Sequence, residues 1–171
     1  MDFWIVAIDH ELQLHRDPSD IPSRRAQKDH LEALLLSELP KRKVRCIAEE
    51  SKIGKTTIAF ALASTNDPRI RWKNISMTEA ERDAAGITEA LKNRPGHPDY
   101  ETMERWIESR IPEDEIREDF FIEQTLGSAR DARSILMLLG DMHVDAVGEK
   151  LTKMGHSVSV NHNLFPVRRW E

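Results

Sequence analysis

Short, continuously apolar runs alternate along this chain with segments of helical periodicity. The runs at residues 3–8, 44–48 and 135–139 are typical of strands buried on both faces of a sheet. Residues 70–77 and 158–160 predict two further, weaker strands. Strands joined by connections long enough to cross over a sheet pair in parallel, with helices on the faces. The pattern therefore predicts an α/β fold with a mostly parallel sheet of about five strands.

Helix boundaries are marked by capping residues, glycines and prolines. The capping-box pattern at residues 78–81 (TEAE) predicts a helix that begins there. Residues 100–110 and 112–126 predict two helices, because Pro112 is well placed in the first turn of the second one. A further helix is expected after the last strongly apolar strand, closed by Gly155.

Size and composition indicate a single globular domain. The chain has 171 residues, enough for one hydrophobic core, and no linker divides it, so we expect one domain spanning residues 1–171. The net charge of −5 argues against nucleic-acid partners, because a phosphate backbone is bound by basic surfaces. No segment approaches the roughly 20 apolar residues of a membrane span, and we read no signal peptide. We expect a cytoplasmic protein without a membrane partner, and its oligomeric state stays open.

Three of the predicted strands end on side chains that can carry chemistry. The segments at residues 7–10 (AIDH) and 140–143 (GDMH) each place a histidine three positions after a small residue, and the strand at 44–48 ends on Glu49 and Glu50. Ligands of parallel α/β sheets collect outside the carboxyl ends of the strands. The sequence therefore predicts one pocket that contains both histidines. Only one of the two glutamates is expected to face it, because successive strand side chains point to opposite faces.

His10, Glu49 and His143 together would suit a divalent metal. Imidazole and carboxylate groups are ligands for Zn, Mn, Fe or Co. The spacing matches no compact metal motif, so such a site would be assembled from distant segments. The alternative is that each histidine is a structural or surface residue, and that Glu49 and Glu50 are solvated strand-end carboxylates.

Arg117 lies beside an apolar stripe on a predicted helix. Phe120, Phe121 and Gln124 follow it at helical spacing. An arginine in this position either lies over the core with its charged head in water, or reaches toward an anion or a buried carboxylate. We include Arg117 as a candidate site residue that would stabilise developing negative charge.

Gly54-Lys55-Thr56 stands between a predicted strand and a predicted helix, which is the context of a phosphate-binding loop. The complete motif requires a glycine where this chain has Glu49. A carboxylate at that position would repel phosphate, so a turn followed by a helix start is the favoured interpretation.

The order of these features resembles one known superfamily, which groups TraB and TIKI proteins, ChaN-like haem-binding lipoproteins and erythromycin esterase-like enzymes. The most similar stretch is residues 134–155, with an apolar strand, Gly-x-x-His and a helix. Residues 116–121 look like the arginine-bearing helix of that superfamily, and Ala7 stands where it usually has glycine. Residues 81–82 and 86–87 resemble a sequence feature of one small bacterial branch of that superfamily. The resemblance implies a parallel α/β core whose histidines, glutamate and arginine converge at one face.

The leading interpretation is a small hydrolase-like protein for a small-molecule or peptide substrate, using His10, Glu49 or Glu50, Arg117 and His143. In one version a divalent metal (Mn, Zn, Fe or Co) lowers the pKa of bound water. In the other, one histidine is a general base and the other polarises the scissile group. A non-catalytic module that binds haem, a metal or an anionic metabolite is the alternative, with haem the weaker candidate. Nucleotide binding at residues 54–56 is the third.

Overall fold

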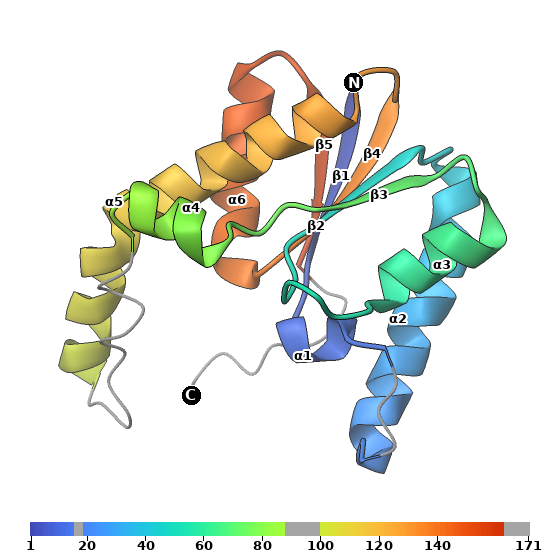
Figure 1. Cartoon of the computed structure of the whole chain (residues 1–171), viewed down its shortest axis with the longest axis horizontal. Coiled ribbons are helices and arrows are strands. Elements are labelled where there is room, and N and C mark those ends of the chain that lie inside the picture. Colours follow the sequence, from blue (N-terminus) through green and yellow to red (C-terminus); the bar gives the residue numbers. More distant parts are fainter. Residues whose placement is uncertain (16–18, 88–99, 163–171) are drawn as a thin grey trace.

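A five-stranded parallel sheet forms the centre of the molecule. The computed structural model describes residues 1–15, 19–87 and 100–162. The strand order is β3-β2-β4-β1-β5, and every neighbouring pair runs parallel (Figure 1). The predicted α/β fold is confirmed. The strands are β1 (Asp2–Ala7), β2 (Cys46–Glu49), β3 (Arg71–Asn74), β4 (Ser134–Leu139) and β5 (Ser157–Asn161).

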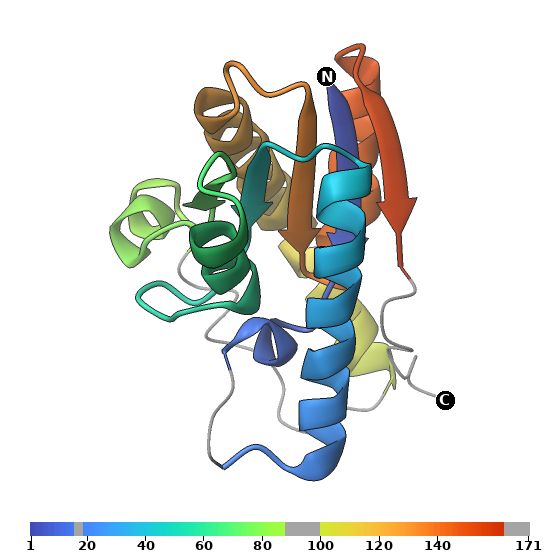
Figure 2. The same cartoon turned by 90° about the vertical axis from the view of Figure 1, so that its right-hand side faces the viewer.

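Helices cover both faces of the sheet (Figure 2). α2 and α3 pack on one face and α5 and α6 on the other, so the fold has three layers. None of the described helices is long and apolar enough to span a membrane. The helices are α1 (His10–Gln13), α2 (Pro22–Lys41), α3 (Ile58–Asn66), α4 (Glu79–Ala84), α5 (Tyr100–Ser128) and α6 (Asp141–Lys153).

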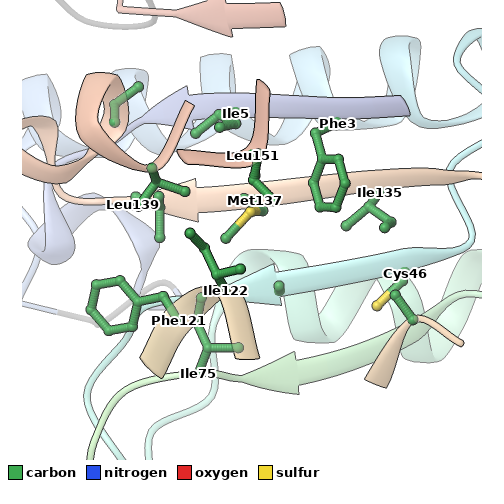
Figure 3. Close-up of a cluster of buried hydrophobic side chains, with 14 of the residues drawn as sticks. Phe3, Ile5, Cys46, Ile75, Phe121, Ile122, Ile135, Met137, Leu139 and Leu151 are labelled. Atoms are coloured by element: carbon green, nitrogen blue, oxygen red, sulfur yellow. The ribbon is translucent and has the colours of Figure 1, made fainter. Parts of the chain in front are cut away.

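The continuously apolar strands supply a core on each side of the sheet. In β1, Phe3 and Ile5 face α5 and α6, whereas Trp4 and Val6 face α2 and α3. All four side chains are buried, which accounts for the absence of polar alternation in this run. Figure 3 shows Ile5 in the first of these clusters, with Met137, Phe121 and Leu151 among its other members. Burying one large apolar side chain contributes about 1.5–3 kcal/mol, so these two cores stabilise the strand ends that carry the site.

One helix prediction was wrong. Residues 100–110 and 112–126 are not two helices but the single helix α5, which contains Pro112. Proline removes one backbone hydrogen bond and clashes with the preceding turn, so it kinks a helix that continues past it. Figure 1 shows α5 bending, with its first turns running in a different direction from the rest.

The other two marked helix boundaries are confirmed. Thr78 and Glu81 form both hydrogen bonds of a capping box at the start of α4. Gly155 follows α6 with a φ of +85°, a left-handed conformation that glycine adopts without steric cost.

The strand order decides which loops meet. The strand arrows all point toward the end of the sheet where α1 lies (Figure 2). β2, β4 and β1 are consecutive in the sheet although they are far apart in the sequence. The segments that follow these three strands therefore lie side by side.

Candidate functional site

Glu50 is the centre of the candidate site. It follows β2 directly, its backbone N–H donates to the carbonyl of Leu138 at 2.9 Å, and its side chain is buried. The Arg117 guanidinium donates from Nη2 to Glu50 Oε1 at 2.6 Å, and the backbone N–H of Gly140 donates to Oε2 at 3.0 Å. His10 Nε2 lies 3.7 Å from Oε2. The carboxylate thus joins residues that follow β1 and β4 to a helix on the sheet face.

Gln13 fixes the orientation of the His10 ring. The Gln13 amide donates from Nε2 to the carbonyl of Glu50 at 2.9 Å, so its Oε1 faces His10 Nδ1, also at 2.9 Å. An amide oxygen only accepts, which places a hydrogen on Nδ1 and leaves Nε2 for chemistry. The distance from Nε2 to Glu50 is too long for a direct hydrogen bond. The His10 side chain is 42% exposed, so a water or a substrate group can reach Nε2.

Gly140 lets the histidine and the glutamate approach each other. A Cβ at this position would lie 3.0 Å from His10 Nε2 and 3.4 Å from Glu50 Oε2. The backbone φ of Gly140 is −57°, which any residue adopts. Glycine at this position therefore relieves crowding and is not needed for backbone freedom.

Arg117 reaches a buried carboxylate, one of the two roles considered for it. Besides Glu50 it binds Asp114, with 3.1 Å between Nη1 and Oδ1. Asp114 also accepts from Arg110 at 3.0 Å. The guanidinium carbon lies 5.7 Å from the centre of the Phe121 ring. These contacts hold Arg117 against the site from α5.

His143 does not share a pocket with His10. It lies in the first turn of α6 and is buried, with Nδ1 3.2 Å from Glu118 Oε1 and its ring edge-on to Phe121. Its Nε2 is 3.9 Å from Asp114, the residue that binds Arg117. The His143 side chain therefore lies beside residues that hold Arg117, and its backbone N–H donates to the carbonyl of Gly140 at 3.0 Å.

Glu49 lies on the opposite side of the sheet from Glu50. Its Oε2 accepts from the Thr57 hydroxyl and from the Trp72 indole, each at 2.6 Å, and its Oε1 is buried without a partner among the described residues. Burial raises the pKa of Glu49 to about 7, against the lowering effect of Thr57, Trp72 and, more weakly, His10. The expectation that only one glutamate faces the pocket agrees with this geometry.

The metal ligand set proposed from the sequence is not brought together. Glu49 is held by Thr57 and Trp72, and His143 by Glu118, away from His10. Within residues 1–15, 19–87 and 100–162, no three histidine, cysteine, aspartate or glutamate side chains are grouped so that they could hold a metal ion. The metal-dependent version has no ligand set in this part of the chain.

A pocket of about 540 Å³, which we call the His10 pocket, opens beside these residues. His10, Glu50 and Arg117 form one part of its lining, and Lys52, Lys55 and Arg82 form another. The last three side chains make no ion pair or side-chain hydrogen bond with any residue that the structure describes. Cations thus exceed anions in this pocket, although the whole chain carries a net charge of −5.

The Gly54-Lys55-Thr56 segment is not the start of a helix. Gly54 has a φ of +77° in a turn, and α3 begins only at Ile58, capped by the side chain of Thr57. In a phosphate-binding loop the lysine and threonine open the helix itself. Here the segment instead places Lys55 on the lining of the His10 pocket.

Sequence reasoning did not select Gln13, Lys52 or Arg82. Gln13 stands three residues after His10, a helical spacing that could have identified it as a partner of the ring. Lys52 lies in the loop after β2 and Arg82 in α4, and no local pattern signals that they line one pocket.

No protein-family model, curated protein or solved structure matches this chain. The superfamily resemblance therefore stays a prediction, and the function has to be argued from the site.

Proposed function

We propose that the His10 pocket binds a small anionic molecule and hydrolyses it with His10 as the general base. The observation that carries this proposal is the held imidazole: Gln13 fixes Nδ1, and Nε2 lies beside both the buried Glu50 carboxylate and the open pocket. A base positioned in this way contributes about 10²–10⁴-fold to a rate.

Water is the nucleophile in the proposed step. His10 Nε2 takes one proton from water as the oxygen bonds to the electrophilic carbon or phosphorus of the substrate. The bond to the leaving group breaks, and that proton passes from His10 to the leaving group. Glu50 stabilises the imidazolium that forms between these two transfers. Lys52, Lys55 and Arg82 attract the anionic part of the substrate.

The test is a panel of chromogenic carboxylic and phosphoric esters, both neutral and anionic. We expect the anionic esters to be hydrolysed. In His10→Gln, kcat/KM is expected to fall by about 100-fold or more, while the thermal stability stays unchanged. His30→Gln, which alters an exposed histidine on α2, is the matched control and keeps the wild-type rate. Equal rates in wild type and His10→Gln, or no hydrolysis of any ester, contradict the proposal.

A non-catalytic anion-binding module is the second candidate. Lys52, Lys55 and Arg82 of the His10 pocket favour it, because these cations have no ion-pair partner among the described residues and attract an anion whether or not His10 acts as a base. On this alternative, inorganic phosphate binds equally well to wild type and His10→Gln, and no ester is hydrolysed.

A further inference from the structure

A second pocket adjoins the His10 pocket on the other side of the turn that contains Gly54. It measures about 470 Å³, and we call it the aromatic pocket because Phe60, Trp72 and Phe120 line it. The two pockets share Ile53, Lys55 and Ser76 in their linings. The two pockets are therefore adjacent, and a ligand that spans them would contact the aromatic rings and the cations together.

Two of the aromatic rings form an angled wall. The ring centres of Phe60 and Trp72 are 5.0 Å apart and their planes meet at 70°. The Trp72 indole N–H donates to buried Glu49, which fixes that ring on β3. Phe60 is 39% exposed and Ile53 56% exposed, although both are large apolar side chains. Exposed aromatic surface beside a pocket is suited to stacking against a planar ring.

The positive charge lies next to this wall. Lys55 lines both pockets, Lys73 lines the aromatic pocket, and Lys52 and Arg82 line the His10 pocket. Lysine and arginine side chains are the usual partners of phosphate oxygens. An anion bound by these side chains would lie close to both the aromatic wall and His10.

We propose that the ligand is a phosphate ester that carries a planar ring, as a nucleoside monophosphate does. The ring lies against Phe60 and Trp72, and the phosphate is bound by Lys52, Lys55 and Arg82. This inference rests on the proposed function, because it names the substrate class for the same site. Lys55 of the Gly-Lys-Thr segment then contributes a side-chain charge, and no phosphate-binding loop is needed.

The experiment is isothermal titration calorimetry with AMP, phenyl phosphate, ribose 5-phosphate and adenosine. We expect AMP to bind about 10-fold or more tightly than ribose 5-phosphate or adenosine, because stacking and charge act together. The result for phenyl phosphate shows whether any aromatic ring suffices or whether the pocket requires a nucleobase. AMP that binds no better than ribose 5-phosphate, or does not bind, overturns the inference.

Variants separate the two parts of the ligand. Phe60→Ala is expected to weaken AMP about 5-fold or more and to leave ribose 5-phosphate unchanged, with Phe60→Leu as a milder variant that keeps an apolar side chain. Lys55→Gln weakens both ligands. Lys153→Gln, an exposed lysine on α6, is the control and changes neither. Unchanged AMP binding in both Phe60 variants overturns the ring site.

Failure of this inference differs from failure of the proposed function. Hydrolysis that depends on His10 but prefers esters without a ring overturns the ligand assignment alone. Ring-dependent AMP binding without any hydrolysis supports the ligand assignment and contradicts the proposed catalysis.

Discussion

Glu49 and Glu50 follow each other at the end of β2, but their carboxyl groups lie on opposite sides of the sheet and in different surroundings. Glu49 is enclosed by α3 and Trp72. Among the described residues, its side chain receives hydrogen bonds only from the uncharged Thr57 hydroxyl and Trp72 indole. Glu50 receives a guanidinium and a backbone N–H, and a histidine lies beside it. Both are buried.

The difference shows that the partners of a buried carboxyl group decide what it can do. No cation among the described residues forms an ion pair with Glu49, and burial therefore dominates and raises its pKa to about 7. Glu50 has Arg117 at 2.6 Å and can hold a cationic group in place beside the pocket. The proposed function therefore uses Glu50, whereas the contacts of Glu49 are those of a structural residue.

The largest expected effect is that of Glu50→Gln. Removing this charge breaks the buried pair with Arg117, which costs about 3–5 kcal/mol of unfolding free energy. It also leaves His10 without its neighbouring carboxylate, so kcat is expected to fall about 100-fold or more. Urea denaturation at pH 8 and the ester assay measure the two effects. A variant with wild-type stability and rate would contradict the role proposed for the Glu50 carboxylate.

Glu49→Gln is expected to have a smaller effect that depends on pH. The pKa of Glu49 rises from an ordinary 4.5 to about 7 on folding, so the folded state binds more protons than the unfolded state between these values. The stability of the wild type therefore falls as the pH rises from about 4.5 through 7, by at most about 3 kcal/mol. Glu49→Gln removes this loss, because an amide does not titrate.

The measurement for Glu49 is the unfolding free energy of wild type and variant from pH 5 to pH 8. The difference is expected to shift in favour of Glu49→Gln as the pH rises, while ester hydrolysis stays close to wild type. A difference that does not change with pH would mean that the Glu49 carboxyl is not held in a low-dielectric site.

Gly140→Ala adds a single methyl group between His10 and Glu50 and tests whether their close approach matters. The new Cβ would lie 3.0 Å from His10 Nε2, so the ring has to move and kcat is expected to fall about 10-fold, with about 1 kcal/mol of lost stability. Gly127→Ala in α5 is the matched control. Its Cβ meets nothing within 4 Å, and alanine in a helix is expected to add about 0.5–1 kcal/mol. Full activity in Gly140→Ala would contradict the close approach of His10 and Glu50.

The sheet could be predicted from the sequence because its strands are apolar and separated by helical segments. The phase of β2 could not, since a run that is buried on both faces does not show which glutamate faces which side. Pro112 was interpreted as a helix start because proline occurs there often, whereas α5 continues through it.

The two histidine motifs looked equivalent but are not in register. Ala7 lies beside Leu139 in the sheet, so Ile8, and not Ala7, is level with Gly140. In addition, His10 is the first residue of α1, whereas His143 is the third residue of α6. Helical side chains rotate by about 100° per residue, so the two histidines project differently from their helices: His10 lines the pocket and His143 lies against Phe121.

The position of β1 between β4 and β5 has a consequence for protein synthesis. β1 leaves the ribosome before both of its hydrogen-bonding neighbours, which lie within residues 134–161. At translation rates of about 5–20 residues per second, roughly 7–30 seconds pass between the synthesis of Phe3, Ile5 and Val6 and that of their partner strands. A nascent chain that stops before β4 leaves this apolar strand with two free edges, which makes it a substrate for chaperones and proteases.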